Sequence, residues 1–211
     1  MNSVKFLAFA ASIALVGFSS VASADTYTFD FDTYITGDTP AGTSWATLTI
    51  SDNGANNVLI RLDHNATSAA GQFITDLWFN LDPFVTVAQQ NPTPAAKFNG
   101  FVASENGVGS AGLTFDLNQS FKTTNAGGGA SRLKPGEFAT FELTGSGLDS
   151  SDFLGLSSGN GNFIAMIHLQ GIDGGGSVKL GAGENFTPVP EPATMGVLGL
   201  GLAALLRRKK K

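Results

Sequence analysis

The chain has 211 residues with 12 basic and 17 acidic side chains, and it contains no cysteine. Without cysteine there can be no disulfide, no thiolate metal site and no cysteine nucleophile. The 27 glycines and a charged fraction of only 14% favour strands joined by turns over helices.

The first 24 residues have the three-part pattern of a secretory signal peptide. Lys5 supplies a positive charge, Phe6–Phe18 is uncharged and apolar, and Ala22–Ala24 ends the segment with small residues. This order predicts a signal helix that directs the chain to the Sec machinery. Signal peptidase would then cut after Ala24, so that the mature chain begins at Asp25.

Residues 25–187 are predicted to form a single domain, which is long enough for one hydrophobic core. Lys5, Glu191 and the five bases of Arg207–Lys211 lie outside this domain. The domain therefore holds 6 basic and 16 acidic side chains, a net charge of −10. An exported acidic domain is a poor partner for nucleic acid, and we expect no nucleic-acid binding.

The first half of the domain shows the period-two alternation of β-strands. The strand-like runs are TYTFDFD (26–32), WATLTI (45–50), VLIRLD (58–63) and QFITDLWFNLDP (72–83). The step Asn53-Gly54 between the second and third runs predicts a hairpin turn. In the fourth run, Phe73, Thr75 and Leu77 are expected to share one face. AQQNPTPAAKFNG (88–100) is predicted to be a loop.

The second half continues with short strands separated by glycine-rich loops. The strand-like runs are GLTFDL (112–117), EFATFELTG (137–145), NFIAMIHLQGI (162–172) and GGGSVKLGAG (174–183). The third is apolar on both faces, which predicts a central strand. Asp149 is a candidate cap for a short helix over Ser150–Leu154, and residues 123–137 are predicted to be a loop. The predicted class is all-β: a single antiparallel, jelly-roll-like β-sandwich between the signal helix and a short C-terminal hydrophobic helix.

Two glycine-rich stretches match enzyme motifs by letter only. Gly107–Gly112 fits G-x-G-x-x-G but precedes a strand, whereas a dinucleotide site needs a strand before it and a helix after it. Gly155–Gly159 fits G-x-S-x-G, yet His168 is the one histidine after Ser157 and no acidic residue lies between them. We therefore expect no catalytic residues and no enzymatic activity, with a secreted hydrolase as a weaker alternative.

Metal and cofactor binding are not predicted. His64 is expected in a polar turn and His168 as a partly buried structural residue, and two histidines so placed have no metal-ligand spacing. Oxygen ligands that recur in turns leave Ca²⁺ binding open as an alternative. These residues are Asp30, Asp32, Asp38, Asp52, Asn53, Asp149, Asp152 and Asp173.

The alternation places both tryptophans on the polar side of their strands. Trp45 would share a face with Thr47 and Thr49, and Trp78 with Asp76. An aromatic ring beside amides and carboxylates is a stacking platform for a sugar, so a carbohydrate-binding module that uses Trp45 and Trp78 is an alternative function. The single T-x-T step at 47–49 is too short for an ice-binding array.

The C-terminal segment combines three features in a fixed order. Pro190, Glu191 and Pro192 are followed by the uncharged run Ala193–Leu206 and by a basic end. As a helix, this run would reach roughly 21 Å, against ~30 Å of bilayer hydrocarbon. The basic end would remain cytoplasmic and so fix the topology. Its residues are Arg207, Arg208, Lys209, Lys210 and Lys211.

This order of features resembles the PEP-CTERM sorting signal, here at residues 188–211 with a lysine-rich end. The stretches GQFITDLWFNLDP and LKPGEFATFELTGSGLDSSDF also resemble exported proteins with this tail. The resemblance implies processing by an exosortase of a Gram-negative bacterium after transient association with the inner membrane. The product would be a secreted or cell-surface protein of a biofilm or exopolysaccharide matrix, with exopolysaccharide as a further partner.

Overall fold

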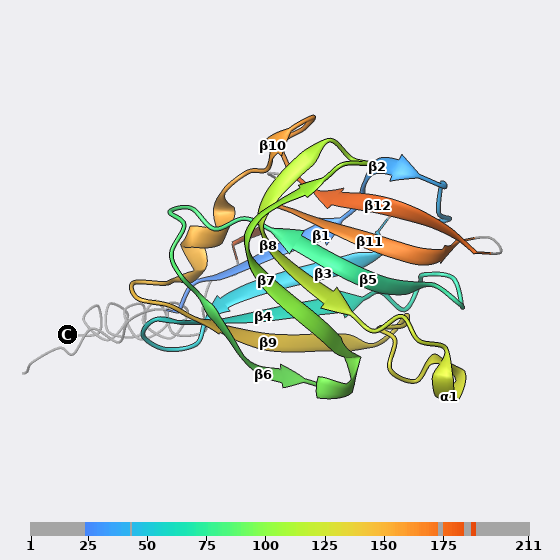
Figure 1. Cartoon of the computed structure of the whole chain (residues 1–211), viewed down its shortest axis with the longest axis horizontal. Helices are drawn as coiled ribbons and strands as arrows, with labels where there is room; N and C mark the ends of the chain where they lie inside the picture. Colours follow the sequence, from blue (N-terminus) through green and yellow to red (C-terminus); the bar gives the residue numbers. More distant parts are fainter. Residues whose placement is uncertain (1–23, 43, 173–174, 184–186, 189–211) are drawn as a thin grey trace, which may run out of the picture.

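The computed structural model of the chain describes residues 24–42, 44–172, 175–183 and 187–188. These residues form two antiparallel sheets around a common apolar core, with few helices (Figure 1). The predicted signal helix and C-terminal hydrophobic helix lie outside this part of the chain. Within the described ranges, no helix is long and apolar enough to cross a membrane.

The first sheet has six strands, and the predicted alternation is confirmed in its central members. In order across the sheet, the strands are β13 (Thr187–Pro188), β1 (Thr26–Phe31), β3 (Ala46–Asp52), β4 (Asn57–His64), β9 (Phe138–Thr144) and β6 (Ala88–Thr93). Every second side chain of β4 is buried. The predicted hairpin joins β3 to β4, and Gly54 takes the positive φ of 99° that its turn requires.

The second sheet has seven strands and carries the candidate site. Its order is β10 (Ser158–Gly159), β8 (Leu113–Phe121), β5 (Phe73–Phe79), β11 (Ala165–Ile172), β12 (Gly176–Ala182) and β2 (Thr33–Gly37), while β7 (Phe98–Val108) pairs with β8. The predicted central strand is β11, because it lies between β5 and β12. Met166 and Ile167 of β11 point to opposite faces, and both are fully buried.

Three short helical segments connect the strands. The predicted helix at Ser150–Leu154 is confirmed as the 3₁₀ helix η2, and the Asp149 carboxylate caps it by accepting a hydrogen bond from the Ser151 amide at 2.8 Å. The long predicted loop contains the short turn α1 (Ala126–Gly129), in which Gly127 and Gly128 have the positive φ values of 60° and 67°. The third is η1 (Ala95–Lys97), which precedes β7.

The prediction of a loop over residues 88–100 is wrong, because β6, η1 and the start of β7 occupy this segment. β6 is an edge strand beside β9, and its side chains are mostly exposed, so no apolar alternation marks it. Pro92 lies where the register between β6 and β9 shifts. An edge strand with an irregular register tolerates proline, whereas an inner strand does not.

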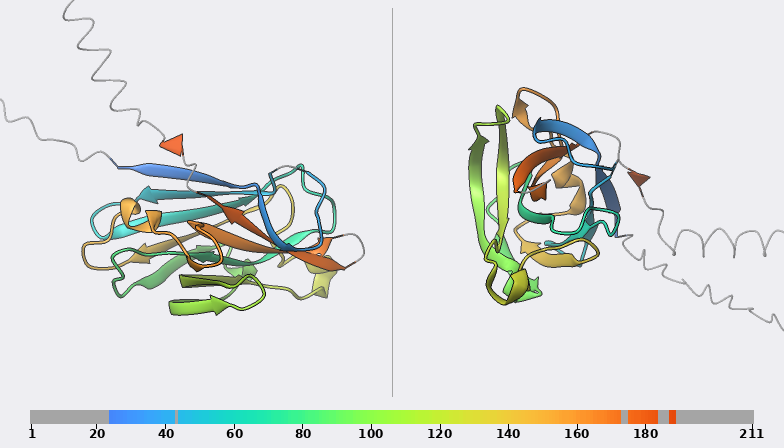
Figure 2. Two further views of the ribbon diagram at one scale, coloured as in Figure 1. Left: turned by 90° about the horizontal axis from the view of Figure 1, so that it is seen from above. Right: turned by 90° about the vertical axis from the view of Figure 1, so that its right-hand side faces the viewer.

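One apolar cluster fills the space between the two sheets. Phe29 and Phe31 of β1 and Leu48 of β3 contribute from the first sheet, while Leu77 and Phe79 of β5 contribute from the second. Figure 2 shows β1 on one side of the molecule and the β7–β8 pair on the other. This arrangement confirms an antiparallel all-β domain, and the jelly-roll connectivity stays a prediction.

Two buried polar side chains link loops to this core. Lys97 is 7% exposed, and its Nζ donates to the Arg132 carbonyl at 2.8 Å and pairs with Glu137 at 2.7 Å. The prediction that His64 lies in a polar turn is wrong, because His64 is the last residue of β4 and is 1% exposed. Its Nδ1–H donates to the Leu133 carbonyl at 3.0 Å.

Candidate functional site

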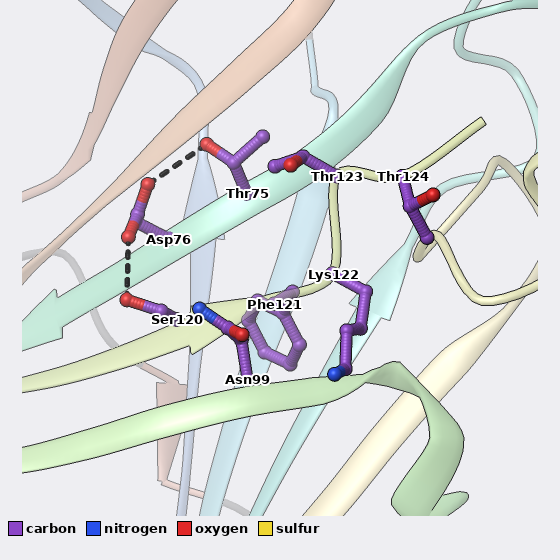
Figure 3. Close-up of a pocket in the computed structure, with 8 residues that line it drawn as sticks. All are labelled: Thr75, Asp76, Asn99, Ser120, Phe121, Lys122, Thr123 and Thr124. Carbon is purple, nitrogen blue, oxygen red and sulfur yellow. Dashed lines mark hydrogen bonds between the residues drawn. The ribbon is translucent and has the colours of Figure 1, made fainter. Parts of the chain in front are cut away.

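A polar pocket of about 350 Å³ lies on the outer face of the seven-stranded sheet, between β5, β8 and the start of β7 (Figure 3). The face is the outer one because Leu77 and Gln119, the neighbours of Asp76 and Ser120 along their strands, are fully buried on the inner side. The residues that line the pocket are Thr75, Asp76, Asn99, Ser120, Phe121, Lys122, Thr123 and Thr124.

A β-bulge in β5 creates the arrangement at the bottom of this pocket. His168 of β11 pairs with Asp76, and Leu169 pairs with Ile74, so Thr75 is the extra residue. The bulge reverses the alternation: Ile74 belongs to the core, and the Thr75 hydroxyl meets Asp76 on the outer face. The prediction that Thr75 shares a face with Leu77 is therefore wrong.

Three polar side chains meet around the Asp76 carboxylate. The Thr75 hydroxyl donates to Oδ2 at 2.8 Å, and the Ser120 hydroxyl donates to Oδ1 at 2.9 Å (Figure 3). His168 Nδ1 is 3.0 Å from the Thr75 hydroxyl oxygen and 3.6 Å from Oδ2. Because Thr75 gives its proton to Asp76, His168 Nδ1 is the donor toward Thr75.

These contacts keep Asp76 ionised. Burial acts to raise the pKa of Asp76, but the nearby His168 ring and hydrogen bonds from Thr75 and Ser120 outweigh it, and the net shift is downward. The pocket therefore presents a carboxylate whose position is fixed by its neighbours. Lys122, also in the lining, adds a positive charge. Such a site suits a hydrophilic ligand with hydroxyl or ammonium donors.

The same geometry does not provide a serine-hydrolase mechanism. A triad needs a histidine Nε2 on the nucleophilic hydroxyl. Here the Ser120 hydroxyl is bound to Asp76, and His168 Nε2 is buried with no hydrogen-bond partner among the described residues. Ser157 of the G-x-S-x-G stretch is 5% exposed, and its hydroxyl accepts from the Phe163 amide and donates to the Gly161 carbonyl. It closes a loop rather than facing a cavity.

Trp45 is not on the polar face that the alternation predicted. β3 begins at Ala46, and the Trp45 ring packs into the core at 6% exposure. Its Nε1–H donates to the Ala41 carbonyl at 2.9 Å. The prediction fails because the alternation was extended one residue beyond the strand, where the chain turns to cover the core.

Trp78 lies on the outer face as predicted, and it is half-buried. It pairs across the sheet with Asn118 and Met166, in the row next to Asp76, Ser120 and His168. One side of the ring packs against a small apolar cluster that includes Val108 and Leu113 at the β7–β8 turn. Of the two predicted sugar contacts, only Trp78 is on the face that carries the pocket.

The remaining predictions give no further site in the described ranges. Gly107–Gly112 forms the end of β7 and the turn into β8. Among the described residues, no three His, Asp or Glu side chains gather closely enough to hold a metal ion. The network around Asp76 was missed from the sequence. The adjacent Thr75-Asp76 pair in an otherwise apolar run is the one local signal that could have marked it.

The predicted sorting residues Pro190, Glu191 and Pro192 and the basic end Arg207–Lys211 lie outside the described part of the chain. Comparison with known families finds one match there: residues 188–211 fit the family of the PEP-CTERM protein-sorting motif. No curated protein and no solved structure matches the chain.

Proposed function

Because the chain carries a PEP-CTERM protein-sorting motif at residues 188–211, we propose that it is a non-enzymatic surface or matrix protein that an exosortase processes. The motif indicates an exported, cell-surface-associated protein. An adhesive or structural role in an exopolysaccharide matrix fits the acidic β domain, because the outer face of its seven-stranded sheet carries a polar pocket that can make contacts.

Each part of the sorting segment has a physical role in this proposal. Pro190 and Pro192 lack an amide hydrogen and have a fixed φ, which suits Pro190–Pro192 to recognition by another protein. Ala193–Leu206 would hold the chain in the inner membrane for a limited time, because 14 residues as a helix would reach only roughly 21 Å against ~30 Å of hydrocarbon. Arg207–Lys211 keeps the end on the cytoplasmic side.

Replacing Pro190, Glu191 and Pro192 together by alanine is expected to leave the β domain folded and exported but uncut. The chain would then accumulate in the inner-membrane fraction instead of at the cell surface. Cell fractionation with an antibody against the domain measures this, with Thr187→Ala, just outside the motif, as the matched control. An unchanged distribution of the triple variant would show that the motif does not direct sorting.

A second function is favoured by the position of Trp78 beside the Asp76 pocket. The ring and the carboxylate lie in neighbouring rows of one face, so a saccharide could stack on Trp78 while its hydroxyls donate to Asp76. We propose that the outer face of the seven-stranded sheet binds the exopolysaccharide of the matrix that surrounds the cell.

Asp76→Asn is expected to weaken polysaccharide binding about tenfold, because a charged acceptor is exchanged for a neutral amide of similar shape. Binding is followed by tryptophan fluorescence against exopolysaccharide purified from the producing cells. Phe84→Ala is the control, since Phe84 is 52% exposed and lies outside the pocket lining. If fluorescence does not respond to any polysaccharide of a panel, this second function is refuted and the sorting function is untouched.

A further inference from the structure

The backbone nitrogen of Asp25, at the predicted start of the mature chain, already has a specific partner. It donates to Asp52 Oδ2 at 2.9 Å. The Asp25 carbonyl accepts from the Asp52 amide at 3.0 Å and from the Ser150 hydroxyl at 3.2 Å. Hydrogen bonds therefore fix both the nitrogen and the carbonyl of Asp25, immediately before β1 begins at Thr26.

The Asp52 carboxylate is oriented independently of what precedes Asp25. Its second oxygen, Oδ1, accepts from the amide of Ser150, the first residue of η2, at 2.7 Å. Asp52 is the last residue of β3, so its backbone position is fixed by the sheet. A pocket of about 320 Å³ adjoins this carboxylate, and Ala24, Asp52, Asn56 and Asp149 are part of its lining.

We propose that Asp52 is a preformed binding site for the new α-ammonium group that signal-peptide cleavage after Ala24 creates on Asp25. Cleavage replaces a neutral amide N–H by a charged group with three hydrogens, at an atom already within hydrogen-bond distance of a carboxylate. Ala24 is part of the lining of the adjoining pocket, so its release leaves space in which water can accept the remaining hydrogens. The amide already donates to an ionised acceptor, so what cleavage adds is the attraction between an ammonium and a carboxylate, which is modest for a solvent-exposed pair.

The electrostatics of this corner favour a positive charge. Asp25, Asp52 and Asp149 surround it, and their combined field is felt at Tyr27, whose pKa burial raises first and these three carboxylates raise further. The domain as a whole has a net charge of −10, with 6 basic and 16 acidic side chains. Removal of the signal peptide thus supplies a positive charge where negative charge is concentrated, and it strengthens a link that Asp52 already makes between residue 25 and η2.

The test compares two chains that both end at Lys211. The first residue of one is Asp25, and the first residue of the other is Ala24. Each is made with Asp52 and with Asp52→Asn, which keeps an oxygen for the Ser150 amide but removes the acceptor facing Asp25. Equilibrium unfolding in urea at low salt gives the unfolding constant of all four chains. Glu105→Gln, an exposed charge on β7, is the control for loss of one negative charge.

The chain that starts at Asp25 is expected to have an unfolding constant about fivefold smaller than the chain that starts at Ala24, since the pair is charged but solvent-exposed. This difference should disappear in Asp52→Asn, persist in Glu105→Gln and shrink below about twofold in 0.5 M NaCl. An equal constant for the two starting points, or a difference that survives Asp52→Asn, would overturn the proposal. N-terminal sequencing of the exported protein that finds a first residue other than Asp25 would also overturn it.

Discussion

Phe141→Ala is expected to lower the free energy of unfolding by about 3–5 kcal/mol. Phe141 belongs to β9 of the first sheet and is 1% exposed. Its ring centroid lies 5.9 Å from that of Phe98 and 6.3 Å from that of Phe79, and both partners belong to the second sheet. Alanine would leave a cavity between the sheets, because strands held by hydrogen bonds cannot close around it.

Phe138→Ala is the matched control for this prediction. Phe138 lies on the same strand, but its side chain is 43% exposed and has the Arg61 guanidinium 3.9 Å from its ring centroid. We expect its loss to cost about 1 kcal/mol or less. Urea unfolding followed by fluorescence measures both variants. If the two substitutions cost the same, the core does not depend on contacts across the two sheets at Phe141.

Acidification is expected to remove about 2–3 kcal/mol of stability through His64 alone. Burial lowers the pKa of His64 to about 4, against the opposing effects of the Leu133 carbonyl and Glu137. In the unfolded chain the pKa is about 6.5, so between pH 6.5 and pH 4 the unfolded state binds a proton that the folded state does not. The contribution is therefore complete above pH 6.5 and is lost as the pH falls toward 4.

The measurement is the difference in unfolding free energy between pH 7 and pH 4.5, for the wild-type chain and for His64→Asn. Asparagine retains an N–H near the position of Nδ1 and can still donate to Leu133, but it does not titrate. The variant should lose about 2–3 kcal/mol less than the wild-type chain over this interval. His168→Asn should retain the dependence due to His64. An identical pH dependence in His64→Asn would show that His64 has the same pKa in the folded and unfolded chain, which would contradict this prediction.

The sequence predicted those strands that bury one regular face. Leu48 and Ile50 of β3 and Ile60 and Leu62 of β4 alternate with polar residues and are fully buried, so side-chain period and burial coincide. Asp149 predicted the start of η2, because a capping carboxylate accepts a hydrogen bond from a backbone amide only two residues further along the chain. Both signals depend only on residues that are close together in the sequence, so the sequence pattern is sufficient to predict them.

Other features depend on contacts that no local pattern contains. Thr75 was assigned to the wrong face because a bulge against β11 reverses the alternation there. Residues 88–93 form a strand because β9 supplies their partners, although neither face of β6 is apolar. The Asp76 network joins β5, β8 and β11. The order of these strands in the sheet cannot be predicted from the sequence of any single strand.

The sorting segment is the opposite case, because the sequence alone predicts this motif and a family model matches it. Pro190–Pro192, Ala193–Leu206 and the basic end are contiguous, and a short linear signal is bound by another protein rather than built by folding. Residues 188–211 match the sorting family even though no relative of the β domain is found.

Mass spectrometry of the exported protein's C-terminus tests exosortase processing most directly. From cells that contain an exosortase, we expect the exported protein to end near Pro190–Pro192 and to lack Arg207–Lys211. From cells without the exosortase, the chain should retain Lys211 and remain in the membrane fraction. An exported protein that ends at Lys211 in both cells would contradict exosortase processing.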